Sequence, residues 1–178
     1  MSGFEIKNLA NPLYFEENVL PPHSDHKYYG SEAELASGCS SFKYSLNGLW
    51  HIHVARNLAE RPEGFEGSDY DCRHWDTIAV PAHIQMEGYG KPHYTNTTYP
   101  WDGHEAIAPG ELPQENSVAS YVKYFAVPEG WQDVRISFQG AETALAVWLN
   151  GHFVGYSEDS FTPSDFDLTP YVQTGENK

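Results

Sequence analysis

The chain has 178 residues, about the length of one ordinary domain, since domains typically contain roughly 100–200 residues. It carries 10 lysines and arginines against 25 aspartates and glutamates, so its formal net charge is −15. Such a surface repels phosphate backbones and anionic lipid headgroups, and we therefore expect neither a nucleic-acid partner nor a membrane partner. The hydrophobic fraction of 40% is enough for a packed core, while 15 glycines and 12 prolines interrupt the chain too often for long helices. This composition favours an all-β fold.

The first residues lack a basic segment followed by an apolar one, and no stretch approaches the ~20 apolar residues that span a bilayer. We expect a cytoplasmic protein. Its two cysteines, Cys39 and Cys72, are too few for a disulfide framework or a cysteine-based zinc site.

Residues 1–45 predict an extended N-terminal arm, because Pro21, Pro22 and scattered charges interrupt every hydrophobic period. Within the arm, residues 31–36 are compatible with a single helical turn. From residue 46 onward, short runs with a period of two alternate with turn residues, which is the pattern of a β-sandwich. The sequence therefore predicts an arm over 1–45 and a sandwich domain over 46–178.

Several strands of this sandwich are predicted by alternation. Apolar side chains recur at every second position over residues 50–54 and again over residues 134–138, which indicates half-buried strands. Residues 121–127 are more uniformly apolar and predict a central strand. Asn150-Gly151 separates two further runs, 144–149 and 152–156, and predicts a β-hairpin because both turn positions need a positive φ.

The segment between Pro81 and Asn116 is rich in Gly, Pro, His and Tyr and is too long for a bare connection, so it is a candidate functional loop.

Beyond the predicted hairpin, Glu158 and Asp159 are adjacent. Glycosidic-bond hydrolysis needs two facing carboxyl groups roughly 5–9.5 Å apart, whereas neighbours along a strand project to opposite faces. Asp165 and Asp167 could share a face, but turn and cap carboxylates are the simpler interpretation.

Nine histidines invite a metal hypothesis, since His23 with His26, and His51 with His53, have spacings that can bring ring nitrogens together. A solvated strand face or a loop explains each of them without a metal. A histidine-based metalloenzyme therefore remains only an alternative.

Five motifs follow one another along the chain. They are SLNGLW at 45–50, VPAHIQMEGY at 80–89, YTNTTYP at 94–100, WLNG at 148–151 and VGYSEDSFTPSDFDL at 154–168. Taken in order, these motifs resemble the N-terminal sugar-binding domain of glycoside hydrolase family 2 β-galactosidases. The resemblance covers essentially the whole chain, and Asn11-Pro12 with residues 20–24 is similar to the arm that precedes this domain.

The resemblance implies a jelly-roll β-sandwich resembling galactose-binding domains, joined in the full enzyme to immunoglobulin-like sandwiches and a catalytic TIM barrel. That enzyme is a retaining glycosidase that hydrolyses terminal β-D-galactosides such as lactose. Its catalytic glutamates belong to the barrel, so no catalytic residue is expected in this chain, which we expect to be inactive alone. The resemblance also implies a domain that continues beyond residue 178, so the chain is expected to be truncated at its C-terminus.

Two residues of this chain match the family's substrate-binding positions. Asn96 matches the asparagine of the YTN(x)TYP loop and Asp159 the aspartate of the GY(x)(x)DS loop, so the resemblance implies that both bind galactose. Asp159 is also implied as a sodium ligand, because a carboxylate suits a hard cation. Without the resemblance, an Asx-turn explains Asn96 and a solvated hairpin end explains Asp159.

The resemblance further implies magnesium in the full enzyme, with ligands outside this chain, and no ion bound tightly to the chain itself. The expected partners are a β-galactoside, the remaining domains of the enzyme and further copies in a homo-oligomer. An independent carbohydrate-binding module is the alternative function, because the tryptophans and tyrosines could stack on sugar rings.

Overall fold

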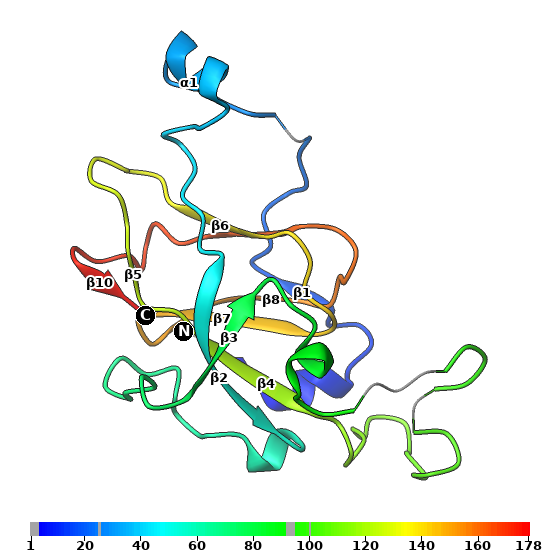
Figure 1. The fold of residues 1–178 in the computed structure, drawn as a ribbon. Coiled ribbons are helices and arrows are strands. Elements are labelled where there is room, and N and C mark those ends of the chain that lie inside the picture. Colours follow the sequence, from blue (N-terminus) through cyan, green and yellow to red (C-terminus); the bar gives the residue numbers. More distant parts are fainter. Residues whose placement is uncertain (1–3, 25, 92–94, 100) are drawn as a thin grey trace.

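The computed structural model describes residues 4–24, 26–91, 95–99 and 101–178, which form an all-β fold with antiparallel strand pairing (Figure 1). Hydrogen-bonded strands occur in the orders β1-β8-β7, β3-β2-β4, β10-β5 and β6-β9. The predicted all-β fold class is therefore confirmed. The strands are β1 (Glu16–Glu17), β2 (Gly48–Ala55), β3 (Asp76–Val80), β4 (Val118–Val122), β5 (Phe125–Ala126), β6 (Arg135–Phe138), β7 (Leu145–Leu149), β8 (His152–Ser157), β9 (Ser164–Asp167) and β10 (Glu176–Asn177).

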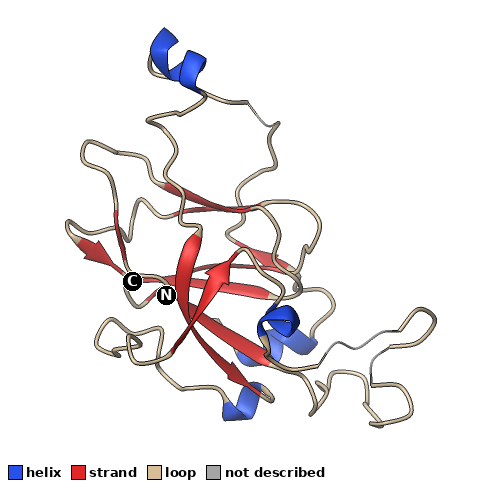
Figure 2. Cartoon of the chain, in the orientation of Figure 1, coloured by secondary structure: helices blue, strands red, loops and turns tan. Residues whose placement is uncertain are grey.

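The helical elements are short and lie at the edges of the β body (Figure 2). They are the α-helix α1 (Glu32–Ser37) and the 3-10 helices η1 (Ile6–Ala10), η2 (Leu58–Glu60) and η3 (Ile84–Glu87). Within the described ranges, no helix has the length and apolar character needed to cross a membrane.

The core lies between the β7–β8 hairpin and the β6–β9 pair. Phe166 of β9 is fully buried and packs with Val147 of β7 and Val154 of β8. Gly155 of β8 allows this close approach, because a Cβ there would lie 2.5 Å from the Phe166 ring and 2.7 Å from the backbone oxygen of Glu17. The sheets therefore meet where β8 carries no side chain.

The predicted hairpin is confirmed. Asn150 and Gly151, with φ values of 53° and 83°, form the turn between β7 and β8. The Asn150 side chain also donates to the Tyr171 carbonyl and to the side chain of the fully buried Asn177. The turn thus links the hairpin to the last strand, β10.

The strand predicted over residues 50–54 is confirmed by β2, but its burial does not alternate: Ile52 is buried, whereas Trp50, Val54 and the two histidines between them are all half-buried. Residues 134–138 do alternate: Val134 is buried, Ile136 and Phe138 are half-buried, and the residues between them are exposed. Apolar spacing was therefore a sufficient signal for both strands.

The prediction of one central strand over residues 121–127 is wrong. The run divides into the end of β4, which pairs with β2, and β5, which pairs with β10. Lys123 and Tyr124 separate the two strands: the Lys123 ammonium donates to the Leu49 carbonyl, and the Tyr124 hydroxyl accepts from the Cys72 amide. A uniformly apolar run cannot show that its two ends pair with different sheets.

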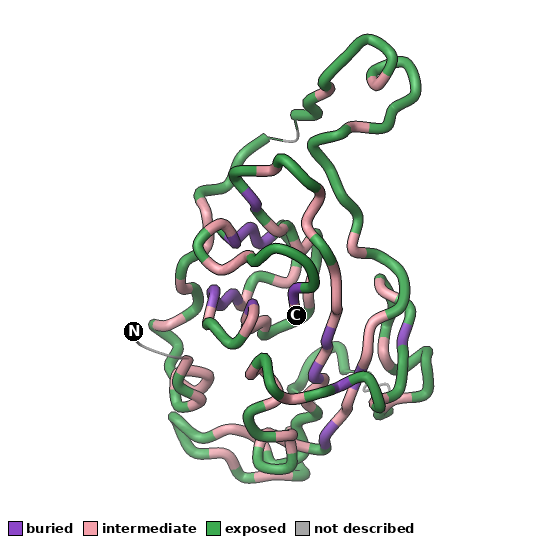
Figure 3. The backbone as a smooth tube through the Cα atoms, turned by 90° about the vertical axis from the view of Figure 1, so that its left-hand side faces the viewer, coloured by how far each residue is buried: buried purple, intermediate pink, exposed green. Residues whose placement is uncertain are grey.

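Part of the predicted arm joins the sandwich. β1 pairs with β8, and Phe4 packs against Trp148, Phe153 and Tyr156. Figures 1 and 3 show that α1 and the segments on either side of it project away from the strands. α1 follows the predicted helical turn, because Ser31 caps its first turn and Gly38, with a φ of 73°, ends it. The boundary at residues 45 and 46 stays a prediction.

Candidate functional site

Asp159 lies in the loop between β8 and β9, and its side chain organises that loop. Its Oδ1 atom accepts the backbone N–H of Phe161 at 2.8 Å and that of Thr162 at 3.0 Å. Its Oδ2 atom accepts the Thr162 hydroxyl. These bonds, with the Thr162 hydroxyl contributing most, lower the pKa of Asp159 below its usual value. The residue is exposed, so an ionised carboxylate is presented to solvent at the end of the hairpin.

Buried hydroxyls hold the beginning and the end of this loop together. The Ser157 Oγ atom accepts from the Asp159 backbone N–H at 3.2 Å and from the Ser164 hydroxyl at 2.9 Å. Both serines are almost fully buried. Thr143 supports the other side of the loop, because its hydroxyl contacts the Glu158 carbonyl and the Ser160 hydroxyl. The loop is thus held at several points beneath Asp159.

The N-terminal segment holds the residues on either side of the same loop. Before it, the Glu158 backbone N–H donates to the Phe15 carbonyl at 3.0 Å. After it, the Asp165 carbonyl accepts from Leu20, and the Asp165 carboxylate lies 2.7 Å from Nε2 of His23. The loop that carries Asp159 therefore depends on residues well before the predicted domain boundary.

The interpretation of Asp165 as a turn carboxylate is wrong. Asp165 belongs to β9, is buried, and contacts His23 across the chain. Asp167 does act as predicted, since its Oδ1 atom accepts the Thr169 backbone N–H at 2.9 Å. The two aspartates have the same local sequence signals, and only the folded arm distinguishes them.

Glu158 and Asp159 have different partners, as predicted, but both lie beyond the end of β8, so the loop and not a strand separates them. Glu158 accepts the hydroxyl of the buried Tyr156 at 2.6 Å, whereas Asp159 contacts its own loop. Burial, and then the hydrogen bond to Glu158, raises the pKa of Tyr156. The two adjacent carboxylates therefore do not form a facing pair for acid–base chemistry.

Asn96 lies in the long loop between η3 and β4, and it is exposed. Among the described residues, no hydrogen bond joins its side chain to another residue, and none links the described part of its loop to the loop of Asp159. Farther along the same loop, Tyr99 and Trp101 stack with ring centroids 5.3 Å apart. Two members of the YTNTTYP motif, Tyr94 and Pro100, lie outside the described residues. The structure places both predicted site residues on exposed loops, and no hydrogen bond joins the two side chains.

His23 and His26 have hydrogen-bonding partners other than a metal, whereas the buried Nδ1 atoms of His51 and His53 have no hydrogen-bond partner among the described residues. His23 contacts Asp165, and Nε2 of His26 lies 3.1 Å from the Ser24 hydroxyl. On β2, His51 packs against Tyr124 and His53 against Trp75. Among the described residues, no group of three or more His, Cys, Asp and Glu side chains is arranged to hold a metal ion.

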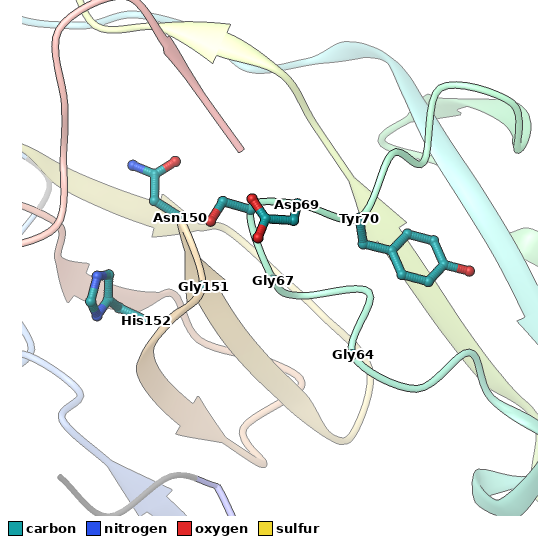
Figure 4. Close-up of a pocket in the computed structure, with 8 residues that line it drawn as sticks. Gly64, Gly67, Asp69, Tyr70, Asn150, Gly151 and His152 are labelled. Carbon is teal, nitrogen blue, oxygen red and sulfur yellow. The ribbon is translucent and has the colours of Figure 1, made fainter.

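Two surface hollows lie away from the predicted site residues. One, of about 460 Å³, is beside β2 and includes His53, Trp75 and Tyr89. The other, of about 610 Å³, is where the hairpin turn approaches the 64–70 segment (Figure 4). Neither includes Asn96 or Asp159. The larger hollow is lined by Gly64, Gly67, Ser68, Asp69, Tyr70, Asn150, Gly151 and His152.

Sequence reasoning missed the residues that support Asp159. Thr162, Ser157 and Ser164 were not singled out, although all three contact Asp159 or its loop. A signal for one of them was present, because a threonine three residues after an aspartate can bond back to its carboxylate in a turn. The serine pair had no such signal, since its two members meet only across the loop.

Comparisons with known proteins agree with this fold. Residues 43–178 match the family model described as "Glycosyl hydrolases family 2, sugar binding domain". The chain is 55% identical over 168 residues to a β-galactosidase of Halalkalibacterium halodurans, covering 92% of this chain and 17% of that protein. It is 48% identical over 184 residues to the β-galactosidase large subunit of Leuconostoc lactis, and the match covers 95% of this chain and 29% of that subunit. The chain thus spans less than a third of the length of either relative.

Solved structures show the same architecture. A β-glycosidase from Bacteroides vulgatus superposes with a TM-score of 0.52 and 27% identity, over 74% of this chain and 16% of that one. A β-glucuronidase from Bacteroides uniformis, 18% identical, gives a TM-score of 0.52 over 75% of this chain and 13% of its own, and it supports the fold alone. The matched motifs, the β-sandwich and the family model agree: the chain belongs to the glycosyl hydrolase family 2 sugar-binding domains.

Proposed function

We propose that this chain is the noncatalytic sugar-binding domain of a β-galactosidase and that it lends Asn96 and Asp159 to the galactose-binding subsite. The observation that supports this most strongly is the 55% identity to a β-galactosidase over 92% of the chain. In this proposal, the full-length enzyme hydrolyses terminal β-D-galactosides with retention, and the carboxyl groups that perform the chemistry lie on its barrel.

The chemistry of the two residues suits such a subsite. The Asn96 amide offers a donor and an acceptor together, so it can orient one sugar hydroxyl. Asp159 can accept a sugar hydroxyl through a charge-assisted hydrogen bond. Both residues are exposed, so a ligand can reach them without displacing the core.

Asp159 also fits a role as one ligand of a sodium ion, because its lowered pKa keeps the carboxylate charged and oxygen ligands suit hard cations. When bound, sodium would supply a positive charge beside the sugar hydroxyls. Among the described residues, no group of three or more His, Cys, Asp and Glu side chains surrounds Asp159, and in this proposal further oxygen ligands come from the rest of the enzyme. Magnesium, the homo-oligomer and the cytoplasmic location stay predictions.

We expect the purified chain not to hydrolyse a β-galactoside, because neither the general acid nor the nucleophile of the proposed mechanism is among its residues. The measurement is the release of a chromogenic aglycone by protein purified from a host that lacks its own β-galactosidase. Turnover that follows the protein through two further purification steps would contradict the proposal.

We also expect the chain alone to bind galactose only weakly, with a Kd above about 1 mM, since small ligands bind well only where most of their surface is buried. Asn96 and Asp159 would form only part of the subsite. An NMR titration of the ¹⁵N-labelled chain with galactose measures the affinity, with mannitol as the control ligand. Saturable binding in the micromolar range would instead favour the alternative, an independent carbohydrate-binding module.

A further inference from the structure

The hollow of about 460 Å³ beside β2 combines aromatic and aliphatic side chains on one surface. Tyr70, Trp75 and Tyr89 contribute aromatic rings, and Ile52 and Val54 of β2 contribute aliphatic surface. The volume falls within the roughly 300–1,000 Å³ of small-molecule sites, which pair a mostly apolar lining with a few polar groups. The hollow therefore has the size and the apolar lining of a ligand site.

Polar groups line the same hollow. His74 and Asp76 are exposed, so an imidazole and a carboxylate are both available to a ligand there. Burial, and then the negative charge and the hydrogen bond of the neighbouring Asp76, raise the pKa of Tyr89, which therefore keeps its hydroxyl proton at neutral pH. The hollow thus offers a charged acceptor beside a hydroxyl donor, and this combination suits a ligand that carries hydroxyl groups.

Trp75 is held in place before any ligand arrives. Its ring packs against the rings of Phe65, at a centroid distance of 5.4 Å, and of Tyr70, at 6.1 Å. His53 of β2 packs against it at 5.4 Å, and the Trp75 backbone N–H donates to the Cys72 carbonyl at 3.0 Å. An aromatic ring that is already fixed loses little conformational freedom when a ligand binds to it.

From these observations we propose that the hollow beside β2 is a second sugar-binding site, in which Trp75 and Tyr89 contact the C–H face of a neutral pyranose and Asp76 accepts its hydroxyl groups. A pyranose ring suits this lining because it presents C–H groups on one face and hydroxyl groups around its edge. The carboxylates of Asp76 and Glu87 beside Tyr89, together with the net charge of −15, disfavour an anionic sugar.

This site is separate from the proposed galactose subsite. Neither Asn96 nor Asp159 lines the hollow. The inference therefore goes beyond the proposed function and holds or fails independently of it.

The first test is an NMR titration of the ¹⁵N-labelled chain with lactose, followed through the indole N–H resonance of Trp75. The chain has 5 tryptophans, and the spectrum of Trp75→Phe assigns this resonance. We expect a saturable shift with a Kd of about 1–10 mM. Glucuronic acid, which is anionic, and mannitol, which has no ring, should leave the resonance in place. A Trp75 resonance that does not respond to lactose, or that responds equally to mannitol, would overturn the proposal.

Variants locate the response. Asp76→Asn keeps the shape of an exposed side chain and removes its charge, and Tyr89→Ala removes one aromatic wall; each should raise the Kd at least about threefold. Tyr28→Ala is the matched control, because Tyr28 is an exposed aromatic residue on the projecting arm and does not line the hollow. It should bind like the parent sequence, as should Asn96→Ala. If Asn96→Ala abolishes the Trp75 shift while Asp76→Asn leaves it intact, the response comes from the other subsite and the inference fails.

The second test uses the full-length enzyme, with hydrogen exchange measured by mass spectrometry. A thiogalactoside, which resists hydrolysis, should slow exchange in the peptide that contains Trp75, and Asp76→Asn should reduce this protection. The kcat/KM of Asp76→Asn for a small chromogenic galactoside should stay within about twofold of the parent enzyme, because the hollow takes no part in the proposed hydrolysis. Absence of protection at Trp75, or equal protection in Asp76→Asn, would show that the hollow is not a sugar site in the complete enzyme.

Discussion

Replacing Asp159 by asparagine in the full-length enzyme is expected to lower kcat/KM for a β-galactoside by about ten- to a hundredfold, because hydrogen bonds to charged groups contribute more than neutral ones. The variant keeps the size of the side chain but removes the charge. It should therefore also weaken the response to sodium. Steady-state kinetics across a sodium titration measure both effects.

Asn96→Ala is the matched comparison, since Asn96 is likewise exposed on a loop but carries no charge. Losing one neutral hydrogen bond should lower kcat/KM by only about three- to tenfold and leave the sodium response intact. Unfolding midpoints of both variants should stay near that of the parent enzyme. A fully active Asp159→Asn enzyme with an unchanged sodium response would show that the proposed role of Asp159 is wrong.

Gly155→Ala is expected to cost the domain about 3 kcal/mol or more of unfolding free energy, because the added methyl group overpacks a filled core. Its Cβ would lie 2.5 Å from two ring atoms of Phe166 and 2.7 Å from the Glu17 carbonyl oxygen. Phe166 is fully buried, and Glu17 belongs to β1, which pairs with β8. Neither neighbour can move away without separating two strands.

Gly140→Ala is the control for this substitution. The nearest atom to its added Cβ would be the Ser160 carbonyl oxygen at 3.8 Å, an ordinary contact. Gly140→Ala should change the unfolding free energy by no more than about 1 kcal/mol in either direction, since alanine also reduces the conformational freedom of the unfolded chain. Urea denaturation of both variants gives the free energies. Equal stabilities would contradict the close packing of β8 on β9.

The local elements of this fold follow from neighbouring residues, and the sequence alone was enough to predict them. Asn150-Gly151 forms the predicted hairpin turn because both positions adopt a positive φ. The β2 strand follows from the apolar spacing over residues 50–54, and the α1 turn follows from its Ser31 cap. These preferences act over a few residues, so no information about the rest of the chain was needed.

The choice of Asp159 and Asn96 as candidate site residues came from the resemblance of the sequence motifs to those of the family. Their exposure on loops is compatible with that hypothesis, although no hydrogen bond joins the two loops within the described residues. What the motifs could not indicate is how the carboxylate is held, because that depends on the path of the backbone between Asp159 and Thr162.

Only the tertiary structure decided which distant segments meet. It divided the apolar run at 121–127 between two sheets, placed β1 against β8, and buried Asp165 beside His23. Strand partners and buried polar contacts depend on residues far apart in the chain, and a hydrophobic period carries no information about its partner. The sequence by itself therefore determined the turns and the strands and, through its resemblance to the family, suggested the candidate residues, whereas packing decided the pairing of the strands and the support of the Asp159 loop.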